Sequence, residues 1–227
     1  MTIMFEKIFK DRSEAGRFLA DRLTYYAARR DVIVLGLPRG GIPVAYEVAQ
    51  KLRAQLDVFT VRKLGVPGHE ELAMGAIASG GVRVLNHDVL SYIRIPDEEI
   101  DRVAADELRE LERRERLYRG ARPPVDVRDR VVIVVDDGLA TGSTVRAAVK
   151  ALRQKGPKQI VVAAPVGARE TCDSFKDEVD VVCVCALTPE PFQAVGLWYE
   201  NFEQTTDDEV RKLLTRAMPG DQRKAAA

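Results

Sequence analysis

The sequence lacks the features that mark several large classes of protein. Its 35 basic and 35 acidic residues leave no net charge, so no overall field attracts nucleic acid or an anionic membrane. No apolar run approaches the ~20 residues that cross a bilayer. Residues Met1 to Lys10 lack the apolar centre of a signal peptide. We therefore expect a cytoplasmic protein that binds neither nucleic acid nor a membrane.

Cysteine is scarce, with three residues in the chain. Cys183 and Cys185 have the spacing of one face of a strand, and Cys172 stands apart from them. This arrangement matches neither a zinc-binding pattern nor a disulfide framework. We expect all three to be buried core thiols.

Two nucleotide-binding motifs are also absent. The chain contains no G-x-x-x-x-G-K-[ST], which cradles nucleoside triphosphates, and no G-x-G-x-x-G, which marks dinucleotide-binding folds. Its 227 residues, 46% hydrophobic and 31% charged, suffice for one substantial core. We expect a single domain over residues 1–227, with its core at about 10–215 and a disordered tail at 219–227.

The stretch from Val131 to Thr144 carries the strongest signal of function. Its five β-branched apolar residues predict a strand buried on both faces, and Asp136 and Asp137 follow directly. After a loop of small residues a helix is expected to begin, capped by Ser143 or Thr144. The free N–H groups and hydroxyls at that helix start form a cradle for a phosphate dianion.

Two carboxylates beside a phosphate cradle narrow the choice of ligand. The remaining possibility is a single phosphate whose neighbouring acids hold sugar hydroxyls or the water shell of Mg2+. A phosphorylated ribose fits this description. In the alternative interpretation the acids merely end a strand and the loop merely starts a helix, but adjacent aspartates beside a buried strand are costly without a ligand.

The stretch resembles the phosphoribosyl-pyrophosphate (PRPP) signature of type I phosphoribosyltransferases, which is an apolar strand, two acids, a short spacer and Thr-Gly-[Ser/Thr/Gly]-Thr. The resemblance implies that the loop Ala140-Thr141-Gly142-Ser143-Thr144 binds the 5-phosphate. It also implies that Asp136 and Asp137 are catalytic, hold the ribose 2- and 3-hydroxyls and bind the cofactor Mg2+. Ala140 stands where the hypoxanthine-guanine branch has a base-contacting aspartate, so the chain is more similar to the adenine and orotate branch.

A second strand, loop and helix precede this stretch. A short buried strand is expected over Val32–Leu35 and a helix over Pro43–Leu52, with a glycine loop between them that also faces an anion. Arg39 adds a positively charged guanidinium group, whose paired N–H donors suit phosphate oxygens. In the resembled family a loop at this place binds pyrophosphate, which implies that role for Pro38-Arg39-Gly40-Gly41, catalysis by Arg39, and a cis peptide between Pro38 and Arg39. A plain turn is the alternative.

The following segment supplies candidates for proton transfer. A strand is expected over Leu56–Val61, with Arg62 and Lys63 at its end, where the resemblance implies contact with pyrophosphate. Residues 64–71 have the Gly and Pro content of a mobile loop, followed by a hairpin over 73–79 and 82–85. The family's flexible loop lies here, so its candidates are His69, Glu70 and Glu71. An ordinary exposed histidine is the alternative for His69.

Two helices follow from periodicity alone. One is expected over Ser13–Arg30 with Ser13 as its cap. The other covers Asp97–Arg119, where charges at i,i+4 spacing flank a narrow apolar stripe. Such a stripe suits packing on the edge of the domain or on a second subunit, and we expect a homodimer. The stripe consists of Ile100, Val103, Ala104, Leu108 and Leu111.

The C-terminal third completes the predicted fold. Strands are expected over 159–164 and 179–186, a helix over 168–176, and a last helix from Thr206 to about Ala217. The alternation predicts an α/β fold with a mostly parallel twisted sheet flanked by helices, a small hood and a long charged helix insertion. Residues 191–202 are similar in spacing to the family's C-terminal hood, so Trp198 and Tyr199 are base-binding candidates. Alternatively, these rings cover a sheet edge.

The expected function follows from the resemblance. The protein would transfer ribose 5-phosphate from PRPP to a nitrogenous base-like acceptor and release pyrophosphate, with Mg2+ required and no covalent nucleophile. A non-catalytic sensor of PRPP or a nucleotide on the same fold is the alternative. A descendant with a vacant site is a third possibility, disfavoured by the intact loops. The sequence does not identify the acceptor.

Overall fold

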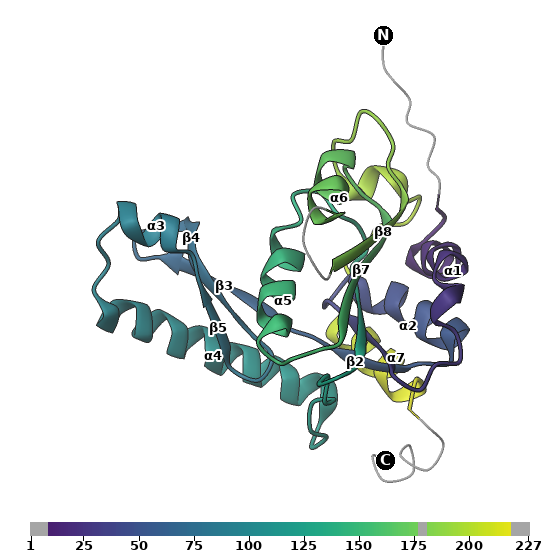
Figure 1. The fold of residues 1–227 in the computed structure, drawn as a ribbon, viewed down its shortest axis with the longest axis horizontal. Coiled ribbons are helices and arrows are strands. Elements are labelled where there is room, and N and C mark those ends of the chain that lie inside the picture. The colour runs from purple at the N-terminus through teal and green to yellow at the C-terminus, as the bar shows by residue number, and fades with distance from the viewer. Residues whose placement is uncertain (1–8, 177–180, 219–227) are drawn as a thin grey trace.

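The computed structural model describes residues 9–176 and 181–218. Its core is a sheet of five parallel strands, seen on the right of Figure 1. In spatial order these are β2 (Gln55–Val58), β1 (Val32–Gly36), β6 (Val131–Val135), β7 (Gln159–Val166) and β8 (Val181–Leu187). The predicted α/β fold class is confirmed.

Helices cover both faces of this sheet (Figure 1). The central strands β1 and β6 are buried throughout, and their alternate residues enter two different clusters. Val34 and Ile133 pack with helices α1 (Arg12–Arg22), α2 (Gly41–Leu52) and α7 (Asp207–Arg216). Ile33 and Val132 pack with α5 (Ser143–Arg153) and α6 (Arg169–Lys176). Continuous β-branched runs are therefore buried because each face has its own helical layer.

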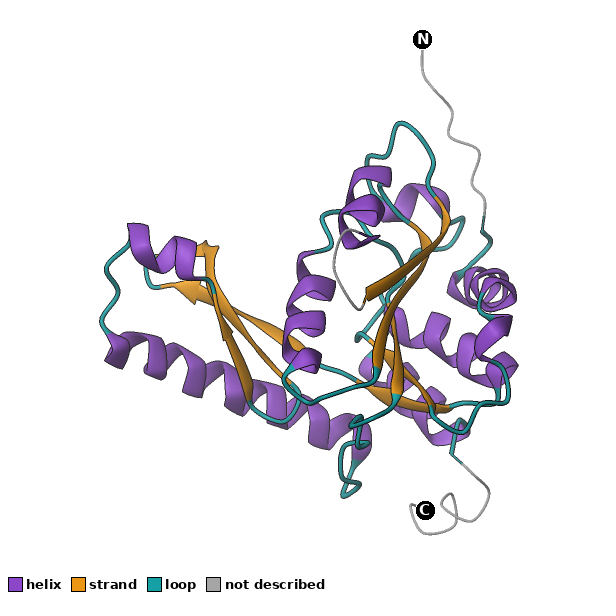
Figure 2. Cartoon of the chain, viewed as in Figure 1, coloured by secondary structure: helices purple, strands orange, loops and turns teal. Residues whose placement is uncertain are grey.

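An arm extends sideways from the core, as the strands on the left of Figure 2 show. It contains an antiparallel sheet of β3 (Val61–Val66), β4 (His69–Ala78) and β5 (Val82–Leu85), with helices α3 (His87–Tyr92) and α4 (Asp97–Arg119). The predicted bounds of α4 are confirmed, and its stripe packs on β3 and β4 through Ile100, Ala104 and Leu111. The stripe thus covers the arm's own sheet.

A buried ionic network joins the arm to the core. Arg119, at the end of α4, donates from Nε to both carboxylate oxygens of Asp57 at 2.9 and 3.0 Å. Its Nη1 lies 3.0 Å from Glu115, which accepts a hydrogen bond from Ser79 at the end of β4. Asp57 also accepts the N–H of Val125 at 3.1 Å. Because Asp57 lies on β2, these contacts fix the arm to the core sheet.

Several predicted bounds require correction. The first helix begins at Arg12, is capped by Asp11 and not Ser13, and ends at Arg22, followed by a 3-10 turn over Thr24–Tyr26. The strand expected over 56–61 ends at Val58, so Arg62 and Lys63 belong to β3 of the arm. The expected loop 64–71 is largely a hairpin, because β3 and β4 pair up to Val66 and His69 across a two-residue turn. The expected tail 219–227 lies outside the described residues.

The prediction of free core thiols is wrong for two cysteines. Cys172 on α6 and Cys185 on β8 form a disulfide, with Cα atoms 6.4 Å apart. Helix α6 packs against β8, which brings these two residues together. The side chain of Cys183 lies outside what the structure describes.

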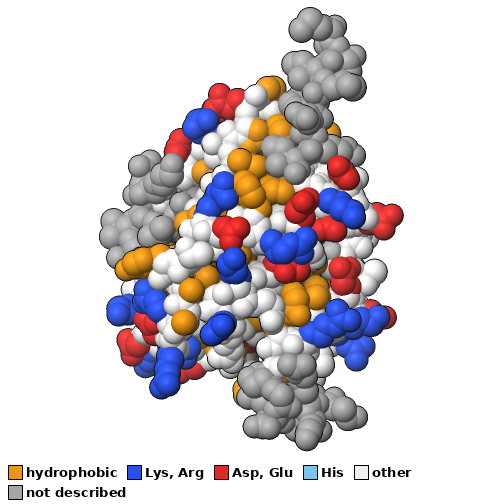
Figure 3. Space-filling view, turned by 90° about the vertical axis from the view of Figure 1, so that its right-hand side faces the viewer, with side chains coloured by type: hydrophobic (Ala, Val, Ile, Leu, Met, Phe, Trp, Pro, Cys, Tyr) orange, Lys and Arg blue, Asp and Glu red, His pale blue; other side chains and the backbone are white. Residues whose placement is uncertain are grey.

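Two further observations concern the predicted partners. No helix within the described ranges is long and apolar enough to span a membrane. On the face shown in Figure 3, acidic and basic side chains are intermixed.

Candidate functional site

Two loops meet at the carboxyl end of the core sheet. Strands β1 and β6 are direct neighbours, with Gly36 opposite Val135. The loops that follow them are therefore adjacent, and the N–H of Leu37 donates to the carbonyl of Val135 at 2.9 Å. The sheet thus brings together the glycine loop and the acid pair, which are about 100 residues apart in the sequence.

Gly40 and Gly41 are glycines because the two loops touch. A Cβ added to Gly40 would lie 2.0 Å from Oδ2 of Asp137, and one added to Gly41 would lie 2.6 Å from the carbonyl oxygen of Val135. Any side chain here would displace the acid pair or the strand end. The glycine pair therefore shapes the carboxylate site as well as its own loop.

The acid pair is held in a desolvated position. Oδ1 of Asp136 accepts the N–H of Asp137 at 2.9 Å. Burial raises the pKa of Asp136 well above its usual value, and the neighbouring carboxylate of Asp137 raises it further. Burial also raises the pKa of Asp137, although Arg12 opposes that shift. Carboxylates in this state favour a ligand that supplies positive charge or hydrogen-bond donors.

Arg12 is a site residue that sequence reasoning missed. Its Nε and Nη2 each lie 2.9 Å from Oδ2 of Asp137, and its Nη1 donates to the carbonyl of Glu203 at 2.7 Å. The guanidinium carbon also stands 4.0 Å from the ring centre of Phe202. The pairing joins residues 125 apart, and no local pattern in the sequence signals it.

The phosphate loop has the predicted position but a different cap. Gly142 occupies the N-cap of α5 with φ of 69°, and no side chain caps this helix. The hydroxyls of Thr141 and Ser143 lie 2.9 Å apart at the first turn, where the N–H of Ser143 donates to Oγ1 of Thr141 at 3.4 Å. The hydroxyl of Thr171 on α6 donates to the carbonyl of Ala140 at 2.6 Å, so α6 helps to hold this loop in place.

The glycine loop has the predicted backbone. The peptide between Pro38 and Arg39 is cis, as expected. The Arg39 side chain is one-third exposed and its Nη1 lies 3.9 Å from Asp207 of α7. Asp207 also accepts a hydrogen bond from the hydroxyl of Tyr118 at 2.7 Å, and burial is the main cause that raises the pKa of Tyr118 to about 12. Arg39 is thus loosely held and accessible to a ligand.

The arm residues do not contact the acid pair in this structure. Arg62 pairs with Glu107 of α4 at 2.6 Å, and Lys63 lies 3.6 Å from Glu71. His69, Glu70 and Glu71 begin β4 and are exposed to solvent. A role for these five residues requires the arm to approach the core.

The two aromatic candidates lie near the site but are buried. Trp198 is 5% exposed and Tyr199 is 1% exposed. The hydroxyl of Tyr199 donates to the carbonyl of Asp137 at 2.6 Å, and its ring packs on Phe9 and Phe202. Neither ring presents a free face to a base, so the stacking prediction is corrected: Tyr199 supports the backbone of the acid pair.

The donor set suits a metal ion that is shared with substrate. Among the described residues, no group of three His, Cys, Asp or Glu side chains is placed to hold a metal. Mg2+ needs few protein ligands, because one or two carboxylates with waters and substrate phosphates complete its shell. Asp136 and Asp137 fit that requirement.

Comparisons with known proteins agree on one family. A family model described as a phosphoribosyl transferase domain matches residues 7–200. A Mycobacterium tuberculosis protein named "Putative phosphoribosyl transferase Rv0571c" is 48% identical over 211 residues, which are 93% of this chain and 47% of that protein. The chain thus spans about half the length of this relative.

Two further matches differ in extent. The crystal structure of TT1426 from Thermus thermophilus superposes with a TM-score of 0.81 at 40% identity, covering 93% of this chain and 100% of that one. A uracil phosphoribosyltransferase from Clostridium botulinum is 47% identical over 62 residues, only 26% of this chain and 29% of that enzyme. The first similarity covers the core and arm together, and the second is local.

Proposed function

Because the chain belongs to the phosphoribosyl transferase domain family, we propose that it transfers ribose 5-phosphate from PRPP to a nitrogen acceptor and releases pyrophosphate. One observation carries this proposal: the glycine loop touches the acid pair, and the phosphate loop follows directly on the same strand end. A phosphate cradle, two sugar-binding carboxylates and a second anion loop are the parts that PRPP requires.

Each part has a distinct task in the proposed reaction. Thr141 to Thr144 hold the 5-phosphate through backbone N–H groups and hydroxyls, and Asp136 and Asp137 hold the ribose 2- and 3-hydroxyls. Arg39 neutralises the pyrophosphate through the fork of its guanidinium. Mg2+, when bound by Asp136, Asp137 and substrate oxygens, would stabilise the charge on the leaving group.

The bond changes are simple to balance. The bond from C1 of ribose to the pyrophosphate oxygen breaks, and its electron pair leaves with pyrophosphate. The lone pair of the acceptor nitrogen forms the new bond to C1, and the nitrogen's proton passes to a base. His69, Glu70 and Glu71 are the proposed bases, and Arg62 and Lys63 further proposed phosphate ligands, once the arm closes over the site.

Calorimetry with PRPP and Mg2+ tests the donor site. We expect Asp137→Asn to weaken PRPP binding at least tenfold, about the 1.4 kcal/mol of one charge-assisted hydrogen bond, with Asp136→Asn similar or milder. Asp88→Asn, an exposed change on the arm helix α3, is the matched control. Unchanged PRPP affinity in both site variants would refute the assignment.

Turnover separates an enzyme from a sensor. A panel of nitrogen heterocycles would be incubated with PRPP and Mg2+, and pyrophosphate release would be measured. At least one heterocycle should cause pyrophosphate release in the wild type and not in Asp137→Asn. PRPP binding without turnover across the panel would instead favour the alternative function, a PRPP or nucleotide sensor.

A further inference from the structure

The disulfide between Cys172 and Cys185 lies beside the residue that leads into the phosphate loop. A Cβ added to Gly167 would lie 2.7 Å from Sγ of Cys172 and 3.1 Å from Sγ of Cys185. The same Cβ would lie 3.1 Å from Cβ of Leu139, which directly precedes the loop at 140–144. Both sulfurs and the side chain of Leu139 thus crowd one point next to Gly167.

Backbone hydrogen bonds join the start of α6 to the same residue. The N–H of Leu139 donates to the carbonyl of Val166 at 2.9 Å, and the N–H of Ala168 donates to the carbonyl of Leu139 at 2.8 Å. Ala168 in turn accepts the N–H of Cys172 at 2.9 Å. Two hydrogen bonds therefore connect Cys172 with the residue that leads into the phosphate loop.

Side chains of α6 contact the phosphate loop itself. The hydroxyl of Thr171 donates to the carbonyl of Ala140 at 2.6 Å. A Cβ added to Gly142, the N-cap of α5, would lie 2.8 Å from Cγ2 of Thr171 and 3.0 Å from Cε2 of Phe175. Thr171 and Phe175 thus pack directly against the turn that begins α5.

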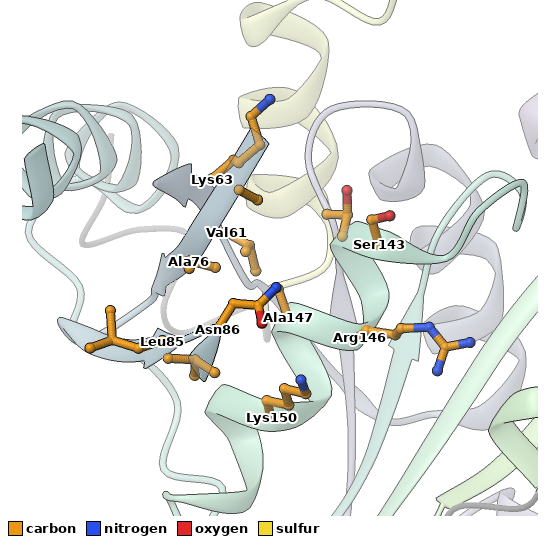
Figure 4. A pocket seen from close by; sticks show the side chains of 13 residues that line it. Val61, Lys63, Ala76, Leu85, Asn86, Ser143, Arg146, Ala147 and Lys150 are labelled. Carbon is orange, nitrogen blue, oxygen red and sulfur yellow. The ribbon is translucent and has the colours of Figure 1, made fainter. Parts of the chain in front are cut away.

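Another contact joins α6 to the helix that follows the loop. The guanidinium carbon of Arg146 on α5 lies 4.5 Å from the ring centre of Phe175, and Arg146 donates to the hydroxyl of Ser174. In Figure 4, Arg146 points away from Lys63 and Asn86 of the arm, on the other side of α5. The position of α6 therefore affects both the loop and the first turns of α5.

Helix α6 is short, so its position depends on what holds it. It has eight residues, and helices shorter than ~12 residues are marginal in water. The disulfide ties it to β8, the outer strand of the core sheet. Reduction removes this tie and leaves two thiols, which need more separation than bonded sulfurs, in a space that Gly167 and Leu139 already crowd. Breaking the bond therefore loosens α6.

We propose that Cys172 and Cys185 form a thiol–disulfide exchange site that sets the affinity of the phosphate loop for its ligand. In the oxidised state α6 is tied down and the loop is preorganised. In the reduced state the loop must be ordered by the ligand, which lowers affinity. The inference rests on the proposed function, because that function names PRPP as the ligand.

The co-reactant is a dithiol. Its thiolate attacks Sγ of Cys185, which is partly exposed on the edge strand, whereas Cys172 is 2% exposed. The S–S bond breaks, a mixed disulfide forms, and Cys172 leaves as a thiolate that takes up a proton. The second thiol of the reductant then displaces Cys185, so the protein gains two thiols and the dithiol becomes a disulfide. The reverse exchange restores the bond.

Calorimetry with PRPP and Mg2+ on the oxidised and reduced protein tests the proposal. Cys183→Ser is the background, because the pair then supplies the only thiols. After oxidised glutathione, the mass should be two hydrogens below that of the protein treated with dithiothreitol. PRPP should bind about tenfold more weakly after reduction, as when one hydrogen bond to a charged group is lost. Unchanged or tighter PRPP binding after reduction, or failure of the bond to form, would overturn the proposal.

A cysteine-free pair shows whether the bond itself is responsible. Cys172→Ala combined with Cys185→Ala lacks the bond whatever the reagent, and circular dichroism would check that it is folded. Its PRPP affinity should equal that of the reduced protein and should not respond to dithiothreitol. An affinity equal to that of the oxidised protein would show that the tie is irrelevant to the loop.

Thr171→Val tests transmission through α6. It removes the hydrogen bond to the carbonyl of Ala140 at nearly the same side-chain shape. In this variant reduction should change PRPP affinity by less than about threefold, because the two changes act on one contact. Thr215→Val, the same change at an exposed position on α7, should keep the full redox effect. A full effect in Thr171→Val would contradict the route through α6.

The oxidised protein separates failure of this inference from failure of the proposed function. Absence of PRPP binding in both states would refute the proposed function. Inorganic phosphate, which requires the loop alone, then becomes the probe of the exchange site. Phosphate binding that is equal in the two states, or absent from both, would overturn this inference as well.

Discussion

The core site and the surface of the arm use charge in opposite ways. On α4, acidic and basic side chains pair three or four residues apart and remain in solvent, as Arg113 and Arg114 do with Glu110. At the acid pair, Arg12 reaches across 125 residues to a largely buried carboxylate. Exposed local pairs stabilise a helix only slightly, whereas a buried pair becomes costly when one partner is lost. The comparison therefore predicts where substitutions will matter.

The largest effect is expected where the two regions join. Arg119→Met would leave Asp57 and Glu115 charged and buried without their partner, which typically costs about 3–5 kcal/mol. Urea denaturation should show that loss, while Arg113→Met on the solvent side of the same helix should change stability by less than about 0.5 kcal/mol. Equal losses in the two variants would erase the distinction between buried and exposed charges.

The second prediction concerns the contact between the two loops. Gly40→Ala places a methyl group where Oδ2 of Asp137 now lies, and Arg12 restrains that carboxylate from moving aside. PRPP affinity should fall roughly 10- to 100-fold, because a displaced Asp137 carboxylate loses charge-assisted hydrogen bonds to the sugar that are worth about 1.5–3 kcal/mol. Gly156→Ala, in the turn between α5 and β7, is the control: its methyl meets no atom within 4 Å, and the strain at its φ of 69° falls away from the acid pair, so PRPP affinity should be unchanged. Normal affinity in Gly40→Ala would show that the loops separate on binding.

The third prediction tests Arg12 itself. Arg12→Met should weaken PRPP binding about tenfold by freeing the Asp137 carboxylate, a loss of ~1.4 kcal/mol, and Arg12→Lys should restore part of it. In a double-mutant cycle, Arg12→Met should add little in the Asp137→Asn background. Tighter PRPP binding in Arg12→Met would mean that the arginine competes with the sugar for this carboxylate.

The smallest effect is expected for Asp136→Asn, which should raise the free energy of unfolding more at neutral pH than at acidic pH. Because burial raises the pKa of Asp136 in the folded state, the folded protein binds a proton at this carboxyl group more tightly than the unfolded chain does. The acid therefore favours folding at pH values below its unfolded pKa of about 3.9, and this contribution is lost as pH rises through the folded pKa. Asp136→Asn should raise stability by about 1 kcal/mol near pH 7.5. The gain should shrink toward pH 4 in thermal melts, and a constant gain would argue against a buried carboxylate.

The parts predictable from sequence are those specified by local patterns. The run of valine and isoleucine at 131–135, the glycine loop at 36–41 and the alternating charges of α4 each specify an element by residues close in the chain. The missed features all depend on long-range packing. Arg12 meets Asp137, Arg119 meets Asp57, and Cys172 meets Cys185 only after the sheet and its helices are assembled. Long-range packing also decides that the strand predicted over 56–61 ends at Val58. Arg62 and Lys63 therefore lie on β3 of the arm and not at the end of a core strand.

The homodimer, the cytoplasmic location and the Mg2+ requirement remain predictions. Sedimentation analysis would test the homodimer, and titration of PRPP binding with Mg2+ would test the metal. Neither measurement depends on knowing the acceptor.

The bridge made by Arg12 has a consequence for how the protein is synthesised. The acid pair is fastened by residue 12, near the beginning of the chain, to the carbonyl of residue 203, near its end. During translation the parallel strands β1 and β6 are available to pair long before residue 203 leaves the ribosome. A nascent chain can therefore pair its central strands early, whereas the fastening of the acid pair through Glu203 and the packing of α7 on the core both wait for residues beyond 200.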